Sequence, residues 1–368
     1  MILKPRLHRT HFIALAVALL IGLALLFSFA RKAHSTLSII DTHEHIESLA
    51  RAEDLLMAMD TVGIERTVLI PSPIETLKMI GNGEFTHYRP NVDEILAITT
   101  KHSGRFVPFC TLSPTDADAL DYLKDCVKRG GQGLKLYNGH SLFYKGFGMA
   151  LDAPAMEPIY AYAEKARLPL LYHANLDGYG EELKRILTRH PDLVVSVPHF
   201  MVSSNKLSRV SDWMDQFPNL YTDISFGFEP YMATGFRNIG KNTKGFRDFI
   251  LAHQDRILFG ADMVLTDIER KDTPYMEAML GCYKALLEER SFHCEPITST
   301  LTKSAETIEK QAGRCKPQSG KYCQSKAKQA AEARQRAKDS KKLKGLNLPA
   351  ETLELIYSKN AEQFLNKL

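Results

Sequence analysis

The stretch LSIIDTHEHI, residues 37–46, begins with a strand-like apolar run and ends on two histidines that lie two positions apart. Side chains along a strand alternate between its two faces, so His43 and His45 project to the same side. Seven more apolar or β-branched runs follow, at residues 66–71, 105–110, 132–137, 168–173, 193–199, 219–225 and 256–262. Because amphipathic helical patterns separate these runs, the sequence predicts a parallel α/β sheet closed into a (β/α)8 barrel, the TIM barrel.

The length of the chain agrees with a barrel that carries two additions. Of the 368 residues, 37–289 and 348–368 are assigned to the barrel, which needs roughly 250 residues. Residues 290–347 are interpreted as a basic, cysteine-containing and partly helical insertion near the last helix. Nine basic and two acidic residues between Lys321 and Lys344 indicate a solvated helical face or, alternatively, a surface for anionic lipid or a polyanion.

The amino terminus predicts a membrane segment. Residues 12–30 are almost wholly apolar, and residues 1–11 before them carry basic but no acidic side chains. About 20 apolar residues are enough to span a bilayer as a helix. We expect an uncleaved transmembrane signal anchor, which makes the membrane a partner and places the barrel outside the cytoplasm, in the periplasm or the extracellular space. The alternative is a signal peptide cleaved after Ala30, which would release a secreted protein.

The cysteine content suits the oxidising compartment that this topology predicts. The chain has six cysteines, and an even number in such a compartment suggests disulfide bonds. Four of them lie around the insertion, and the sequence leaves their pairing open: Cys282, Cys294, Cys315 and Cys323. Cys110 and Cys126 are interpreted as buried thiols instead.

The distribution of charge along the chain indicates which kinds of binding partner to expect. The net charge is +4, but basic residues are concentrated at the amino terminus and in the insertion, which leaves the rest of the chain acidic. An acidic barrel repels polyanions, so no nucleic-acid partner is expected and a small-molecule substrate is favoured. The sequence is compatible with a dimer and does not determine the oligomeric state.

Polar residues gather at the predicted carboxyl ends of the strands, where barrel enzymes carry their sites. Beyond the two histidines of the first strand, these residues are Lys135, Tyr137, His173, His199, Asp223 and Asp262. A lone His-X-His pair is weak evidence, because satisfied core or surface histidines produce it as well. Together with His173 and Asp262, however, the pair forms a three-nitrogen, one-oxygen donor set suited to Zn²⁺ or a similar divalent ion.

The ordered series IIDTHEHI, GLKLY, LPLLYHA, VPHF, LYTDIS, RILFGAD and LPAETLELIYSKNAEQFL resembles the amidohydrolase superfamily. Its nearest branch is the amidohydrolase-related (amidohydrolase 2) group, which includes aminocarboxymuconate-semialdehyde decarboxylase-like proteins. The resemblance covers residues 38–275 and 348–366. It implies one divalent metal ion, with Zn²⁺ as the expected ion, bound by His43, His45, His173 and Asp262. It also implies that His199 works beside the metal-bound water.

Two departures from the family pattern concern the pocket. The usual histidine-Leu-Gly-Gly sequence is His199-Phe200-Met201 in this chain, and Asp262 is followed by Met263 where the family has Tyr-Pro or similar. Both changes put the substrate class in doubt more than the metal.

Lys135 and Tyr137 are predicted to bind substrate, Lys135 through a substrate carboxylate. Two alternatives for Lys135 are an ion pair inside the barrel with Asp41 or Asp223, and a carbamate that bridges two metals. Glu44, between the two histidines, faces the other side of the strand and is interpreted as structural.

The reaction that this set predicts is hydrolysis of a small carboxylic ester, lactone or amide by a metal-activated water. Asp262 is expected to accept the water proton, while His199 orients the hydroxide or stabilises the oxyanion. The first alternative is a metal-dependent, non-oxidative decarboxylase, which an aromatic-lined pocket would favour. The second alternative is a non-catalytic, membrane-tethered barrel.

Overall fold

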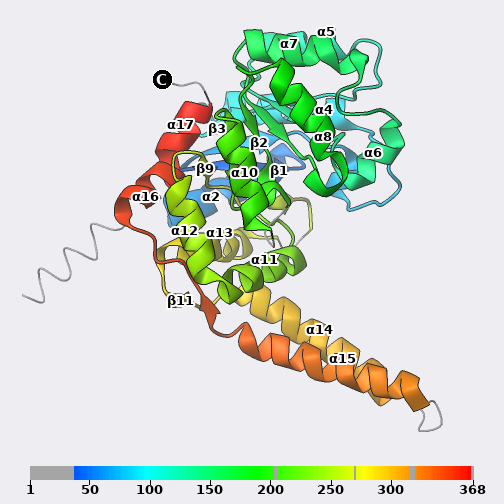
Figure 1. Cartoon of the computed structure of the whole chain (residues 1–368), viewed down its shortest axis with the longest axis vertical. Coiled ribbons are helices and arrows are strands. Elements are labelled where there is room, and N and C mark those ends of the chain that lie inside the picture. Colours follow the sequence, from blue (N-terminus) through cyan, green and yellow to red (C-terminus); the bar gives the residue numbers. More distant parts are fainter. Residues whose placement is uncertain (1–36, 203–205, 269–270, 315–319, 366–368) are drawn as a thin grey trace, which may run out of the picture. The chain divides into compact units, whose positions relative to one another are not determined.

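The computed structural model describes residues 37–202, 206–268, 271–314 and 320–365 (Figure 1). The chain divides into two units, residues 1–37 and 38–368, and the secondary structure given below belongs to the second. The predicted signal anchor at residues 12–30 and its basic flank at residues 1–11 lie outside the described residues. Within the described ranges, no helix combines the length and the apolar character needed to cross a membrane.

Parallel strands form the barrel, which confirms the predicted α/β fold. They are β1 (Ile39–Ile46), β2 (Ile64–Ile70), β3 (Phe106–Pro108), β4 (Cys110–Thr111), β5 (Leu134–Leu136), β6 (Leu170–Tyr172), β7 (Val195–Ser196), β8 (Leu220–Asp223), β9 (Ile257–Leu258) and β10 (Val264–Leu265). Neighbours pair in the orders β10-β1-β2-β3 and β4-β5-β6-β7-β8-β9. The predicted third run supplies both β3 and β4, so it connects the two sheets. The barrel closes where the Thr42 N–H donates to the Phe259 carbonyl, 2.9 Å away.

Helices occupy most of the connections between strands. They are α2 (Ala52–Val62), α3 (Ile74–Leu77), α4 (Tyr88–Lys101), α5 (Ala119–Lys128), α6 (Ser141–Phe147), α7 (Glu157–Lys165), α8 (Leu176–Arg189), α9 (Pro198–Val202), α10 (Leu207–Gln216), α11 (Glu229–Lys241), α12 (Thr243–Ala252), α13 (Thr273–Glu288), α14 (Glu295–Gly313), α15 (Gly320–Asp339), α16 (Ala350–Glu354) and α17 (Asn360–Phe364), with short turns η1 (Leu49–Arg51), η2 (Pro154–Met156) and η4 (Leu355–Lys359). Apolar side chains at helical spacing explain why they pack on the sheet. In α5, for example, the buried residues are Ala119, Leu123 and Cys126, which share one face.

The carboxyl-terminal segment closes one end of the barrel. The Phe364 ring on α17 packs on Tyr221 of β8, with 5.4 Å between ring centroids. The Asn360 side-chain amide donates to the Ile257 carbonyl at the first residue of β9. Because α17 covers the amino-terminal end of this strand, the opposite ends of the strands are left for a site.

Two disulfide bonds lie wholly within the described ranges, and one of them corrects an expectation. Cys110 on β4 is bonded to Cys126 on α5, with 6.1 Å between their Cα atoms, so the interpretation of these residues as free buried thiols is wrong. The sequence does not show that α5 folds back onto the strand 16 residues before it. A second bond, Cys282–Cys294, joins α13 to the residue before α14, and Cys323 is disulfide-bonded as well.

The basic insertion contains a helical pair. Its ends are joined by β11 (Ser291–Phe292) and β12 (Leu343–Lys344), which pair antiparallel. Between them, α14 and α15 run side by side (Figure 1). Their contact is made of small side chains: Ala333 and Ala337 of α15 cluster with Ala305 of α14, and Leu301 packs against them.

Candidate metal centre

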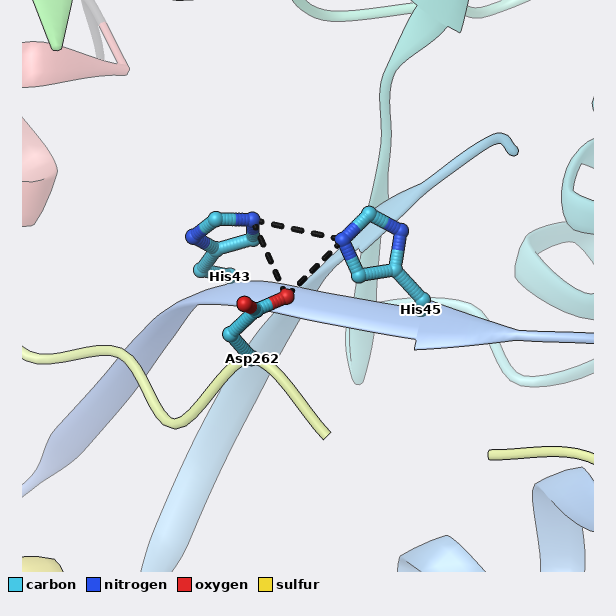
Figure 2. Close-up of side chains that lie close together, drawn as sticks. All are labelled: His43, His45 and Asp262. Atoms are coloured by element: carbon cyan, nitrogen blue, oxygen red, sulfur yellow. Dashed lines mark hydrogen bonds and ion pairs between the residues drawn. The ribbon is translucent and has the colours of Figure 1, made fainter. Parts of the chain in front are cut away.

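Three of the four predicted ligands converge at the carboxyl end of the barrel (Figure 2). His43 and His45 project from β1, and Asp262 follows β9, where its backbone N–H donates to the His43 carbonyl at 2.7 Å. The Asp262 Oδ1 lies 3.0 Å from His45 Nε2 and 3.4 Å from His43 Nε2. The two Nε2 atoms are 3.3 Å apart. One point in space is therefore within reach of two imidazoles and one carboxylate.

Hydrogen bonds behind the two histidines fix which ring nitrogen faces this point. His43 Nδ1 lies 2.9 Å from Asp223 Oδ2, and His45 Nδ1 lies 2.6 Å from Ser72 Oγ. With the protons on both Nδ1 atoms, both Nε2 atoms present lone pairs to each other and to Asp262. Carboxylate or hydroxyl partners of this kind commonly orient metal-binding histidines.

The protonation states of the three converging side chains favour the binding of a cation. Burial lowers the pKa of His43 to about 4, and it also lowers the pKa of His45, so both rings are neutral at pH 7. Burial opposes ionisation of Asp262, but the neighbouring His43 and His45 hold its pKa well below the usual range. Two neutral imidazoles and a carboxylate that face one another are a ligand set of the kind that binds Zn²⁺. The residues present therefore fit one divalent ion.

His173, the fourth predicted ligand, is not one of the three converging residues. Its ring lies 5.1 Å from the ring of His199 and 4.4 Å from that of His140, measured between centroids. Burial lowers its pKa well below the ordinary value, so His173 is a neutral imidazole in the same cavity. Its assignment to the metal remains a prediction.

His199 stands beside the converging set, as predicted for a group that acts next to the metal. Its ring stacks on that of His43, with centroids 5.5 Å apart, and its Nε2 lies 3.6 Å from Asp262 Oδ2. The Nδ1 atom is 3.0 Å from the Ser225 carbonyl, to which it donates. The Nε2 atom therefore faces Asp262 and the cavity.

The backbone around His199 adopts an uncommon conformation. Four successive residues, His199 to Val202, have φ between +50° and +61°. A left-handed conformation costs an L-residue roughly 1–2 kcal/mol, and glycine, which the family pattern has at the positions of Met201 and Val202, would avoid this cost. Asp223 Oδ1 accepts the His199 N–H at 2.8 Å, and Thr222 Oγ1 accepts that of Met201 at 3.2 Å. Asp223 thus holds both the His43 ring and the turn that carries His199.

Lys135 and Tyr137 lie beneath the metal centre. Lys135 Nζ is 3.3 Å from His43 Nε2, and burial lowers its pKa to about 8. Throughout the described ranges Lys135 has no ion pair, so the predicted pairing with Asp41 or Asp223 is absent, because Asp223 is bonded to His43 instead. The Tyr137 hydroxyl donates to the Pro71 carbonyl at 2.9 Å. Neither Lys135 nor Tyr137 lines the cavity above the metal centre.

That cavity has a volume of about 540 Å³ and opens at the carboxyl ends of the strands. His140, His173, His199 and Asp262 are among the polar residues that line it. Its wall carries exposed apolar side chains, among them Met79 (61% exposed), Ile80 (41%), Phe228 (37%) and Tyr231 (66%). Apolar side chains gathered around a polar floor are typical of a site for a small molecule with an apolar part.

Several residues of the site are absent from the sequence-based prediction. His140 follows β5, and its Nδ1 accepts the Leu142 N–H at 3.1 Å, so its Nε2 carries the proton. Gly227 has φ +64°, and a Cβ atom there would lie 2.6 Å from Asp262 Oδ2. Ser72 holds His45. The dipeptide Gly139-His140 after the fourth run was a visible signal, whereas nothing in the sequence marks Ser72 or Gly227.

Glu44 and Asp41 form a second group of buried carboxyls behind β1. Burial raises the pKa of Glu44 well above its ordinary value and that of Asp41 to about 7. Glu44 does not line the cavity, which agrees with its structural interpretation.

The fold and the site together define a TIM barrel with a His-X-His candidate metal centre at the carboxyl ends of its strands. A family model described as amidohydrolase matches residues 40–313. The chain therefore belongs to the amidohydrolase family, in the amidohydrolase 2 group that its motifs resemble.

Comparison with solved structures gives several similar folds. A zinc-bound amidohydrolase from Burkholderia multivorans is 10% identical, with a TM-score of 0.50 over 89% of this chain and 99% of that one. An uncharacterised TIM-barrel protein from Bordetella bronchiseptica is 18% identical, with a TM-score of 0.49 over 76% and 100% of the two chains. The 5-carboxyvanillate decarboxylase of Sphingomonas paucimobilis is 14% identical, with a TM-score of 0.46 over 90% and 99%. The search of curated proteins gave no match.

Proposed function

We propose that this chain is a metal-dependent hydrolase that cleaves a carboxylic ester, lactone or amide bond of a small molecule. The observation that carries the proposal is the position of His199 Nε2, 3.6 Å from Asp262 Oδ2, while Oδ1 of the same carboxylate faces the two histidines. One side of the carboxylate thus serves a metal and the other serves proton transfer. A carboxylate that binds a metal through one oxygen and accepts a proton through the other suits a reaction in which water attacks the substrate.

The metal that we propose is one Zn²⁺ ion, held by His43, His45 and Asp262 with His173 as the predicted fourth ligand. The Burkholderia amidohydrolase with bound zinc supports this choice of ion. When bound, Zn²⁺ supplies Lewis acidity, which lowers the pKa of water and polarises a carbonyl group.

The side chains of this protein then have distinct tasks. Asp262 accepts a proton from the attacking water at Oδ2 and passes it to the leaving group. His199 orients that water through Nε2, because its Nδ1 proton is held by the Ser225 carbonyl. His140, with its proton on Nε2, is placed in the cavity wall to donate to an oxyanion. Lys135 and Tyr137, the predicted substrate-binding residues, position the histidines from beneath.

The second candidate function is non-oxidative decarboxylation of an aromatic or enoic acid, as the resembled branch also performs. The aromatic character of the cavity favours it. Aromatic side chains line the cavity at five positions: Phe143, Phe226, Phe228, Tyr231 and Tyr275. Stacking on such rings would hold a flat substrate, and this reaction needs no attacking water.

We also propose that the barrel works outside the cytoplasm, tethered by residues 12–30. The bonds Cys110–Cys126 and Cys282–Cys294 support this, because disulfides persist in oxidising compartments. Protease added to intact cells or spheroplasts should degrade the barrel together with a known external control. An intact barrel beside a degraded control would contradict the proposed location.

The reaction is tested with the purified, zinc-loaded full chain on panels of aryl esters, lactones, anilides and aryl carboxylic acids. Hydrolysis predicts released acid or amine and no CO₂, with ¹⁸O from labelled water in the acid product. Released CO₂ from the aryl acids alone would establish the decarboxylase instead. No turnover on any panel, in a chain that retains metal, would favour the non-catalytic barrel. The His43→Ala variant serves as the inactive control in every panel.

A further inference from the structure

A second cavity lies between α11 of the barrel and the helical pair of the insertion. Its volume is about 510 Å³. The apolar side chains that line it come from α11, α14, α15 and β12: Ala233, Phe236, Ile297, Leu301, Ala333 and Leu343. This groove, as we call it, is of a size that takes a small organic molecule.

Basic side chains surround the apolar lining. They come from α11 and from the end of the insertion: Arg237, Lys241, Arg336, Lys342 and Lys344. The lining has one carboxylate, Asp339, and its Oδ1 accepts a hydrogen bond from Gln335. The five cations outnumber the one carboxylate, so the groove carries an excess of positive charge that an added anion would offset.

The five cations of the groove are not paired with carboxylates in the part of the chain that the structure describes. Within the ranges that the structure describes, none of them forms an ion pair or a side-chain hydrogen bond. On the barrel, by contrast, Arg89 pairs with Asp116 and Asp118, and Arg185 pairs with Asp152. The remaining lysines of α15, such as Lys328, are also exposed but lie outside the groove. At the groove, these unpaired cations adjoin an apolar lining.

We propose that the groove is a binding site for a small amphipathic anion, a carboxylate, sulfonate or phosphate group on an aryl or acyl body. The cations supply attraction for the head group, and the apolar lining removes the body from water. Neither component suffices alone: the lining gives no preference for charge, and exposed lysines bind simple anions weakly. The site does not depend on the proposed reaction, because it shares no residue with the metal centre.

The groove is connected to the metal cavity through α11. Thr234 lines both cavities, while Tyr231 faces the metal cavity and Arg237 the groove. An anion in the groove therefore binds the helix that forms part of the wall of the metal cavity.

The proposal is tested with naphthalene-1-sulfonate and its neutral analogue naphthalene-1-sulfonamide, by equilibrium dialysis against the full chain. We expect one sulfonate per chain, bound about tenfold or more tighter than the sulfonamide, a ratio that corresponds to ~1.4 kcal/mol. Inorganic sulfate should compete weakly. Equal binding of sulfonate and sulfonamide would overturn the role of charge, and equally tight binding of sulfate would overturn the role of the apolar lining.

Two pairs of variants locate the bound probe. Arg237→Glu with Arg336→Glu should weaken sulfonate binding at least tenfold, while Lys321→Glu with Lys328→Glu, the same change in charge outside the groove, should leave it within twofold. A milder Leu301→Ser variant should weaken sulfonate binding without changing the charge. The His43→Ala variant should still bind the sulfonate, which excludes the metal cavity as the site. Loss of binding in His43→Ala, or equal effects of the two charge-reversed pairs, would overturn the proposal.

Discussion

Polar side chains gather at both the metal centre and the groove, but those of the metal centre are held in place by hydrogen bonds and, among the described residues, the cations of the groove are not. At the metal centre, His43 and His45 are buried, and each ring is held by a hydrogen bond to Asp223 or Ser72. In the groove, the cations are the ends of long, exposed side chains, such as Arg336 and Lys342, without partners among the described residues. A fixed centre suits an ion and a reaction with strict geometry, whereas an adaptable rim suits anions of varied shape.

The largest effect should come from removing a ligand of the fixed centre. His43→Ala removes one of the three converging ligands and leaves only Asp262 and His45. Metal affinity should fall by more than about 100-fold, because even residues that only orient ligands contribute about 10–100-fold. Metal analysis after dialysis and turnover of the best substrate measure this. His293→Ala, at an exposed histidine outside the centre, is the matched control. A His43→Ala variant that kept both metal and activity would contradict the assigned centre.

A smaller effect is expected where a group acts beside the ion without holding it. His199→Asn should lower kcat by roughly 10²–10⁴, the usual contribution of a general acid or base, with metal stoichiometry near that of the parent. Asparagine is chosen because it tolerates the left-handed backbone at this position. Metal loss that parallels the loss of turnover would make His199 a ligand instead.

The fixed centre also depends on a residue without a side chain. Gly227→Ala would bring a Cβ to 2.6 Å from Asp262 Oδ2, in a backbone conformation of φ +64° that alanine rarely adopts. The carboxylate must move, and metal affinity should fall about tenfold, the lower end of the range for residues that orient ligands. Gly281→Ala on α13, where a Cβ meets nothing within 4 Å, should leave metal affinity unchanged. Equal affinities for the two variants would show that Asp262 is not constrained by Gly227.

The sequence predicted those parts of this centre that follow from regular geometry. The two-residue repeat of a strand places His43 and His45 on one face, and the parallel barrel brings Asp262 to the same end. Gly227 and Ser72 escaped prediction because their roles depend on contacts between residues far apart in the sequence. The pairing of Cys110 with Cys126 was missed for the same reason. The predicted ion pair of Lys135 failed because hydrogen bonding to His43 competes for Asp223.

For the insertion, the sequence predicted the composition and the helices but not the candidate binding site. Its basic composition and helical pattern were visible, but the sequence alone gave no reason to prefer a binding site to a solvated face. That preference depends on Arg237 and Lys241, which lie on α11 about 100 residues before the end of α15 and meet the insertion only in the fold.

The smallest expected effect compares one arginine from each region. Arg185 on α8 donates to both oxygens of Asp152, at 2.6 and 3.3 Å, while Arg336 on α15 lies in the groove without an ion pair among the described residues. Both sit within helices, so the change in helix propensity on replacement by alanine cancels between them. Arg185→Ala should lower the free energy of unfolding slightly, as expected for an exposed ion pair, and Arg336→Ala should leave it unchanged or raise it slightly, because like charges then repel less.

Urea unfolding of both variants beside the parent measures this difference, and its dependence on pH and salt identifies the cause. The hydrogen bond from Arg185 lowers the pKa of Asp152 below its ordinary value of 3.8. A carboxyl group with a lowered folded-state pKa stabilises the fold above its unfolded-state pKa and loses that contribution as the pH falls through the folded-state pKa. The Arg185→Ala deficit should therefore be present at pH 7, diminish below about pH 4 and shrink in high salt. An equal deficit for Arg336→Ala at pH 7 would mean that Arg336 is paired in solution, and the contrast between the two regions would no longer hold.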